Sequence, residues 1–376
     1  MITDNLCTAC GACASVCPLK CIEIKRDCNG FYNPEIDEDR CVKCNRCSKV
    51  CPANQRAKGK NWLDGEYYAC WAKEKTQRFE GSSGGLFGLL AAETIKRNGI
   101  VFGAAFTKDF EAVYQTSTEH VSLSALKKSK YIESYTGTIF AEVKQKLDEG
   151  KDVLYCGTAC QIDGLINYLG KSYENLLICD FLCQGVVSSG LYKRYIENLE
   201  KKDGEISFLS FRSKQYGWKA YCIYATFKSG KHYLKTKFQD PYLRMYFEHI
   251  GIRDACFECQ RLKNSNADIT LGDYWNASTN KKIKDTNEGI SLVGIHTEKG
   301  KKAFEEIKSE CEVFLLENKD CSYAFTRTIK RPVNREEELT KLSQIDNLFD
   351  SPVPLKVRIK GFLYWLRAAM QRMSLK

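Results

Sequence analysis

The sequence has only four histidines among its 376 residues, so a histidine-rich metal site or a chain of histidine proton carriers is not expected. No apolar run approaches the roughly 20 residues of a membrane-spanning helix. The first residues are polar and lack the basic and then apolar segments of a signal peptide, which predicts a cytoplasmic protein. With 43% hydrophobic and 28% charged residues, the composition is typical of a soluble globular chain of two or three domains.

Cysteine, in contrast, is abundant, with 20 copies. In a long chain without a signal segment, cysteines are expected to be thiolate ligands or small buried residues, because disulfides belong mainly to secreted proteins. Cys21 and Cys28 fall outside any motif, and Cys21 is interpreted as a packing residue.

Two cysteine runs repeat one pattern. Residues 7–18 read CTACGACASVCP and residues 41–52 read CVKCNRCSKVCP. Both have the spacing C-x2-C-x2-C-x3-C-P, in which three thiolates bind one [4Fe-4S] cluster and the fourth binds a second cluster. The alternative is zinc, whose four-cysteine sites usually use C-x2-C pairs set well apart. We therefore expect one cluster on Cys7, Cys10, Cys13 and Cys51, and another on Cys41, Cys44, Cys47 and Cys17.

The formal net charge of +10 overstates the basic character of the holoprotein. Thiolate-ligated clusters carry negative charge, which would offset part of it. Binding of nucleic acid is therefore not expected.

A small-residue turn, Ser82-Ser83-Gly84-Gly85, precedes an expected helix from Leu86 to about Asn98. Backbone N–H groups at such a helix N-terminus, together with the helix dipole, suit a phosphate, although an ordinary helix cap is the alternative. A second polar patch holds Lys127, Lys128, Ser129, Lys130 and Tyr131. Its lysines either face solvent or neutralise a diphosphate.

Strands are expected at 66–72, 100–106, 152–155 and 176–182, with a helix at about 162–169. A strand, a helix and a strand in succession predict an α/β layer whose functional edge lies where the strands end. Cysteines follow both of the later strands, and a C-x2-C comes further on. Four thiols from three loops could hold a third cluster or could be small core residues: Cys160, Cys183, Cys256 and Cys259.

Taken together, these motifs resemble the coenzyme F420 hydrogenase/dehydrogenase beta-subunit family over roughly residues 1–310. The order of the motifs carries the resemblance: the two cysteine runs, SSGG at 82–85, SKY at 129–131, GTACQ at 157–161, CQG at 183–185, FRSK at 211–214 with GW at 217–218, Cys256 with Cys259, and DITLGDYW at 268–275. Ala159 and Gln184 stand where the family usually has proline and histidine, and neither change removes a thiolate. The sequence looks more like the bacterial branch associated with surface-polysaccharide gene sets.

The resemblance implies an iron–sulfur and flavin-dependent oxidoreductase. It implies FAD beside a [4Fe-4S] cluster, a third cluster on the four later thiols, and exchange of electrons between clusters and a hydride carrier, F420 or another. Partners would be ferredoxin or a partner subunit, and a hydride carrier or small-molecule substrate. No catalytic residue is identified. The implied flavin-binding residues are Ser82, Ser83, Gly84, Gly85, Ser129, Lys130 and Tyr131.

Two other functions stay open. The chain could be a non-catalytic electron-transfer subunit, or an accessory iron–sulfur protein in surface-polysaccharide biosynthesis. Purified protein without reductase activity that still reduces a partner would favour the first of these. Loss of flavin with retained function in cells would favour the second.

The expected fold class is α/β, α+β overall, with a small dicluster ferredoxin domain followed by a mixed-sheet flavin-binding α/β domain. The expected boundaries are 1–60 for the ferredoxin-like domain, 61–150 and 151–320 for the two parts of the flavin-binding domain, and 321–376 for a basic helical tail. In the tail, apolar residues recur at helical spacing from Leu355 to Met373. This stripe is expected to pack on the domain or to dock to a partner subunit, and peripheral contact with an anionic membrane is the alternative.

Overall fold

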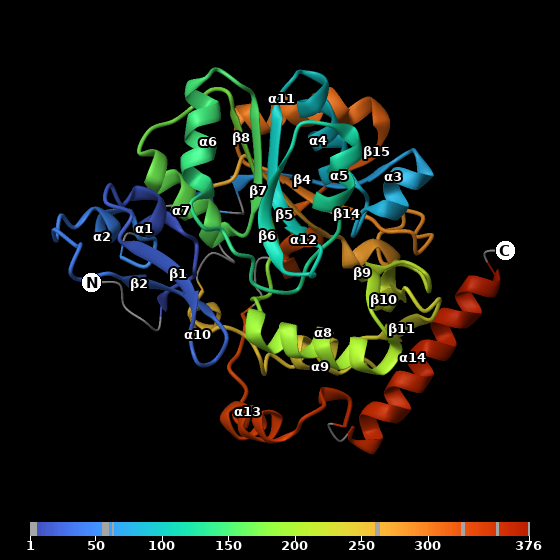
Figure 1. Cartoon of the computed structure of the whole chain (residues 1–376). Coiled ribbons are helices and arrows are strands. Elements are labelled where there is room, and N and C mark those ends of the chain that lie inside the picture. The colour runs from blue at the N-terminus through green and yellow to red at the C-terminus, as the bar shows by residue number, and fades with distance from the viewer. Residues whose placement is uncertain are drawn as a thin grey trace.

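The computed structural model describes residues 6–54, 60–61, 64–259, 264–324, 328–350 and 353–374. The N-terminal unit is small and lies at one side of the molecule (blue in Figure 1). Each cysteine run forms one short helix that ends directly before its fourth cysteine. The elements of this unit are α1 (Ala12–Val16), β1 (Ile22–Arg26), β2 (Tyr32–Ile36) and α2 (Arg46–Val50), and β1 pairs antiparallel with β2.

A mixed sheet of eight strands forms the centre of the larger domain. Four neighbouring strands run parallel, and antiparallel strands extend the sheet at both edges. In sheet order the strands are β15 (Cys311–Leu316), β4 (Glu66–Ala72), β14 (Ser291–Ile295), β13 (Ile269–Asp273), β8 (Leu176–Phe181), β7 (Val153–Gly157), β5 (Ile100–Phe106) and β6 (Ala112–Ser117).

Helices cover both faces of this sheet, as a parallel sheet requires. One face packs on the apolar sides of three helices through residues such as Leu90, Leu126 and Phe304. The other face packs on two helices through Phe140 and Leu165, and Cys10 and Ala12 of the N-terminal unit join that core. The first set is α4 (Leu86–Lys96), α5 (His120–Leu126) and α11 (Glu298–Ile307), and the second is α6 (Ile139–Asp148) and α7 (Ala159–Leu169).

A second, smaller sheet lies below the first in Figure 1 and has three antiparallel strands. Its core is rich in aromatic side chains, including Tyr195, Phe211 and Tyr242. The elements are α8 (Ser189–Asp203), β9 (Ile206–Ser213), β10 (Cys222–Phe227), β11 (His232–Thr236), α9 (Pro241–Phe247) and α13 (Arg335–Gln344). Short elements complete the described chain: β3 (Lys60–Asn61), α3 (Lys75–Glu80), η3 (Trp218–Ala220), α10 (Asp254–Phe257), β12 (Asn264–Ser265), η4 (Trp275–Ser278), η5 (Lys308–Glu310), α12 (Asn318–Cys321), η6 (Ser322–Ala324) and η7 (Leu348–Asp350).

The expected α/β class with a mixed sheet is confirmed, and the four predicted strands occur as β4, β5, β7 and β8. The helix expected at about 162–169 begins earlier, at Ala159. The Thr158 side chain and that of Gln161 form a capping box there, which extends the helix by one turn. Cys160 therefore lies in the first turn of α7 rather than in a loop.

The expectation that the apolar stripe of the tail packs on this chain's own domain is wrong, whereas its docking to a partner subunit stays a prediction. The helix α14 (Leu355–Ser374) forms, but it contacts the domain through Gly361 and Tyr364. The stripe itself lies on the opposite side, and Leu355, Ile359 and Phe362 are each more than half exposed. Among the described helices, none is both long and apolar enough to cross a bilayer.

A buried ion pair joins the N-terminal unit to the larger domain. Arg253 Nη2 lies 2.9 Å from Glu133 Oε2, and both side chains are almost completely buried. Arg253 also donates to the carbonyl oxygens of Cys7 and Tyr32, while Glu133 accepts from the backbone N–H groups of Tyr32 and Ser189. The pair thus fixes the backbone of the first cysteine run against two distant segments of the chain.

Replacing Arg253 with leucine is expected to lower the free energy of unfolding by about 3–5 kcal/mol, because it leaves the Glu133 carboxylate buried without its partner. Urea denaturation under anaerobic conditions measures the change. The control is Arg97→Leu, which removes a surface pair with Glu306 and should cost less than about 1 kcal/mol. Equal losses in the two variants would contradict the role given to the buried pair.

Candidate cofactor cavity and thiol sites

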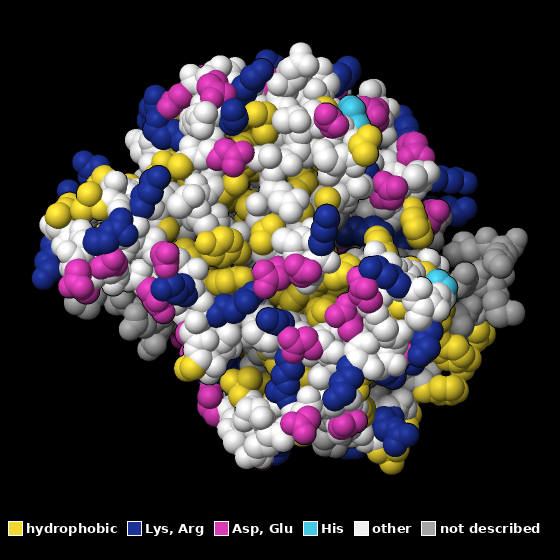
Figure 2. Space-filling model, viewed as in Figure 1, with side chains coloured by type: hydrophobic (Ala, Val, Ile, Leu, Met, Phe, Trp, Pro, Cys, Tyr) yellow, Lys and Arg dark blue, Asp and Glu magenta, His cyan; other side chains and the backbone are white. Residues whose placement is uncertain are grey.

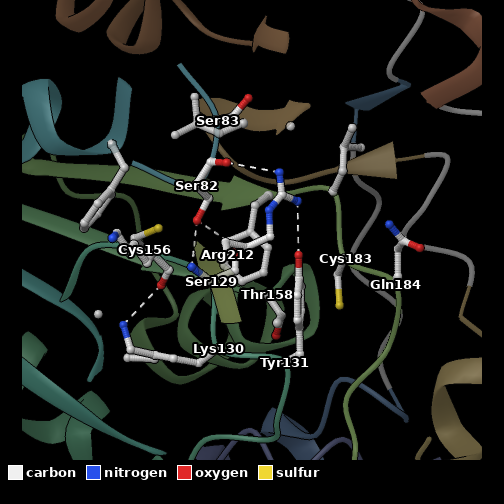
Figure 3. A pocket seen from close by; sticks show the side chains of 18 of the residues that line it. Ser82, Ser83, Ser129, Lys130, Tyr131, Cys156, Thr158, Cys183, Gln184 and Arg212 are labelled. Atoms are coloured by element: carbon white, nitrogen blue, oxygen red, sulfur yellow. Dashed lines mark hydrogen bonds between the residues drawn. The ribbon is translucent and has the colours of Figure 1, made fainter. Parts of the chain in front are cut away.

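A cavity of about 250 Å³ opens at the carboxyl ends of β7, β8 and β13. Its walls come from segments far apart in the sequence: the turn at 81–85, the segment 126–134, and residues 181–186. Arg212 from β9 and Trp275 close one side. Figure 3 shows Ser82, Ser129, Tyr131 and Arg212 converging on this space. The location agrees with the expectation that the strand ends form the functional edge.

The Ser-Gly turn lies at the N-terminus of α4, which faces the cavity. Gly85 is the N-terminal cap with φ +90°, and its lack of a side chain leaves the first N–H groups of the helix without a side-chain acceptor. Gly84 lies against the sheet, since a Cβ there would come within 2.3 Å of the Cys70 carbonyl oxygen. Among the four predicted residues, Ser82, Ser83 and Gly85 line the cavity and Gly84 supports the turn from behind.

Ser83 is turned away from the ligand space. Its hydroxyl donates to the Ile290 carbonyl oxygen over 2.7 Å. The Ser82 hydroxyl instead accepts from the backbone N–H and the hydroxyl of Ser129. The two predicted patches are therefore joined directly by one serine pair.

The segment 127–131 wraps around the Lys130 side chain. Lys130 Nζ lies 2.9–3.2 Å from three backbone carbonyl oxygens, those of Ala125, Lys127 and Lys128. Burial, with a smaller effect from Lys128, lowers the pKa of Lys130 to about 7. Lys130 thus shapes the loop. Lys128 adds positive charge to the cavity wall, whereas the charge of Lys127 is paired with Glu80 over 2.8 Å.

Arg212 connects the groups around the cavity. It makes a bidentate ion pair with Asp273, with N–O distances of 3.0 and 3.1 Å, and its side chain is buried. The same guanidinium donates to the Tyr131 hydroxyl and to the Ser82 carbonyl oxygen. Because guanidinium donors have a fixed planar geometry, one side chain sets the positions of three cavity groups.

Aromatic rings hold this ion pair in place. Trp218 donates its indole N–H to Asp273 over 2.8 Å and stacks on Trp275 with ring centroids 4.4 Å apart. Arg212 lies 4.1 Å from the centroid of Tyr221, and Tyr131 stacks on Tyr246. Sequence reasoning used the segments 211–214 and 268–275 only as family markers and assigned no site role to Arg212 or Asp273.

The thiols of the first predicted cluster lie in one neighbourhood. Cys7, Cys10, Cys13 and Cys51 are all buried. Burial, together with the nearby thiols of Cys7 and Cys51, raises the pKa of Cys13 to about 12. Bare thiolates are unfavourable there, whereas bound iron would supply the compensating positive charge. These residues fit a [4Fe-4S] cluster.

The second predicted set lies beside the first. Cys17, Cys41 and Cys47 pack against one apolar cluster of the N-terminal unit, and Cys44 is exposed. Cys21 is buried in that cluster, with its sulfur 3.4 Å from that of Cys17. Its packing position agrees with the interpretation from the sequence, and the assignment of the other four as ligands stays a prediction.

The four later thiols line one small pocket that adjoins the main cavity. Cys160 lies in the first turn of α7, Cys183 follows β8, and Cys256 and Cys259 lie on either side of the end of α10. Burial raises the pKa of Cys256 to about 12 and also raises that of Cys183, with neighbouring thiols adding to both shifts. The donor set fits a third cluster, which stays a prediction. Within the described ranges, no group of three or more His, Cys, Asp or Glu side chains is placed to hold a single metal ion.

The first and third thiol sets approach each other at Gly164 of α7. A Cβ at this position would come within 2.7 Å of the Cys10 sulfur. Cys160, one helical turn earlier, is close enough for its charge to affect the pKa of Cys10, which burial raises most strongly. Gln184, where the family usually has histidine, lies on the cavity wall next to Cys183.

Replacing Lys130 with methionine is expected to change the pH dependence of stability. Between pH 7 and its ordinary pKa, Lys130 is neutral in the folded chain and protonated in the unfolded chain, so its contribution to stability rises with pH in this window. From pH 7 to 9, the unfolding free energy of wild type minus that of Lys130→Met should therefore increase by up to about 1.4 kcal/mol per pH unit. Urea denaturation at several pH values measures it. A difference that does not change with pH would show that Lys130 stays protonated in the folded chain.

Two parts of the chain match known protein families. Residues 150–319 match the family of the C terminus of the coenzyme F420 hydrogenase/dehydrogenase beta subunit, and residues 6–55 match a 4Fe-4S dicluster domain. No curated protein gives a significant match. One similar solved chain belongs to the F420-reducing [NiFe] hydrogenase complex from Methanosarcina barkeri, with 14% identity, a TM-score of 0.47, and coverage of 77% of this chain and 98% of that chain. Residues 150–319 of the chain described here thus match the C-terminal region of the coenzyme F420 hydrogenase/dehydrogenase beta-subunit family, and a 4Fe-4S dicluster domain precedes this region.

Proposed function

We propose that this chain is an iron–sulfur flavoprotein oxidoreductase that passes electrons between [4Fe-4S] clusters and FAD and exchanges a hydride with F420 or another carrier. The family matches support the coarser part of this proposal, an iron–sulfur electron-transfer subunit related to F420 hydrogenase beta subunits. The finer part rests on one observation: the main cavity and the four-thiol pocket share a wall that contains Cys160, Cys183 and Gly185.

The cavity suits a flat, anionic cofactor. The N–H groups and dipole of α4 favour phosphate at one end, and Lys128 adds positive charge. Tyr131, Tyr221 and Trp275 supply apolar, aromatic surface on another side. When bound, a flavin exchanges hydride with a carrier and single electrons with iron–sulfur centres. The choice of FAD over FMN rests on the family resemblance.

The residues of the chain position and shield this space. Arg212 holds the Ser82 turn and Tyr131 in fixed positions. The hydrogen bonds between Ser82 and Ser129 join this turn to the segment 127–131. Cys160, Cys183, Cys256 and Cys259 would hold a cluster at the shared wall, where four protein thiolates leave no open coordination position. No side chain is assigned as a proton donor, since Lys130 and Tyr131 both make interactions within the protein.

Anaerobic purification with counting of iron, sulfide and released flavin tests the proposal. About twelve irons and one FAD per chain are expected, since each cluster holds four irons. Cys256→Ala should lose about four irons, whereas Cys28→Ala, which changes an exposed cysteine outside the motifs, should lose none. About eight irons without flavin would overturn the flavoprotein proposal and favour a non-catalytic electron-transfer subunit. The proposed role in polysaccharide biosynthesis rests on the resemblance alone.

Replacing Arg212 with lysine tests the cavity separately. Lysine keeps the charge but cannot donate to Asp273, Tyr131 and Ser82 in the same planar arrangement. Bound flavin per chain should fall about tenfold or more, while the iron content stays unchanged. The control is Arg97→Lys at the surface, which should retain full flavin. If Arg212→Lys retains flavin, the guanidinium does not organise the binding site.

A further inference from the structure

The helix α14 has two different faces. One face meets the smaller sheet, where the Tyr364 ring packs against Ala220 and Cys222 and the Phe238 side chain lies against Gly361. The opposite face bears an apolar stripe, since residues three or four positions apart share one side of a helix. The stripe consists of Leu355, Ile359, Phe362, Leu363, Leu366 and Met370, whose exposed fractions run from 39% to 68%.

This stripe lies at the rim of the molecule. Figure 1 shows α14 running along the outer edge of the smaller sheet, and Figure 2 shows yellow side chains gathered along the same edge. An amphipathic helix of a globular protein normally buries its apolar side in the domain. Here the domain contacts the other side, so the apolar side is exposed and available to a binding partner outside this chain.

Charge indicates what covers it. Residues 351–376 contain six Lys and Arg residues and no Asp or Glu. Lys356 and Lys360 lie on one flank of the stripe and Arg358 on the other, and all three are exposed. Two copies of α14 facing each other would bring these basic flanks together, which disfavours self-association. Apolar residues bordered by cations are the pattern of a helix that lies in the surface of an anionic membrane.

We propose that α14 docks this protein onto an anionic lipid surface, with the stripe in the acyl boundary and the flanking cations at the headgroups. Trp365, partly buried beside Phe362, lies at the border of the stripe, where an indole ring favours the interface between lipid and water. The contact of Tyr364 and Gly361 with the smaller sheet would hold the domain at the membrane in one orientation. This proposal does not depend on the flavin.

Cosedimentation of the full chain with lipid vesicles tests the proposal. Phosphatidylcholine vesicles that contain phosphatidylglycerol should bind the protein, and pure phosphatidylcholine vesicles should bind it about tenfold less. High salt should weaken binding because it screens the cations. The triple variant Ile359→Gln, Phe362→Gln, Leu363→Gln should lose binding. A second variant, Lys356→Gln with Arg358→Gln, should bind the anionic vesicles about tenfold more weakly.

Matched controls separate binding from folding. Val121→Gln with Val333→Gln removes exposed apolar residues away from α14 and should bind like wild type. The triple variant alters only exposed side chains, so its iron content and helical circular dichroism should equal those of wild type. Absence of binding to either vesicle by wild type would overturn the proposal. So would a dimer in solution that the triple variant abolishes, because a second copy would then cover the stripe.

Discussion

The arrangement of this molecule depends on one buried ion pair. Arg253 and Glu133 join the backbone of the first cysteine run to the loop before the C-x2-C and to the segment beside the cavity. Both charges lie out of contact with water, so each needs the other and its additional hydrogen bonds. Arg253 lies close enough to the thiols of Cys7 and Cys256 for both to raise its pKa, so the pair links the first and third thiol sets. A ferredoxin unit on a loose linker would have no such fixed relation to the cavity.

Much of the plan was predictable from the sequence, for different physical reasons. Iron–sulfur ligation needs thiolates at short, regular spacings, so the two cysteine runs can be recognised without a structure. The buried strands are continuous apolar runs, and β4 and β5 begin and end where the sequence predicts. The start of α7 was missed because a capping side chain, not hydrophobic periodicity, determines it. The tail was predicted as a helix. Which of its faces contacts the protein depends on small residues such as Gly361, and the hydrophobic periodicity of the sequence does not show this.

The centre of the cavity could not be predicted from local pattern. Arg212 and Asp273 are 61 positions apart, and neither stands in a motif whose spacing alone suggests an ion pair. Their meeting follows from the way the smaller sheet packs against the end of the larger one. The predicted residues Ser82, Ser129 and Tyr131 all depend on this pair or on each other for their positions. The sequence motifs therefore predict residues that line the cavity, and the fold brings in the Arg212–Asp273 ion pair that fixes their positions.

Gly164 has a consequence for the speed of electron movement. Its single hydrogen atom lets α7 approach the Cys10 sulfur so closely that a methyl group would not fit. Electron tunnelling between two centres weakens exponentially as the gap between them widens. If electrons pass from the N-terminal unit to the proposed third cluster at this contact, the close approach at Gly164 would raise the rate of that transfer. Under that proposal, the absence of one methyl group would help to determine how quickly electrons cross between the two domains.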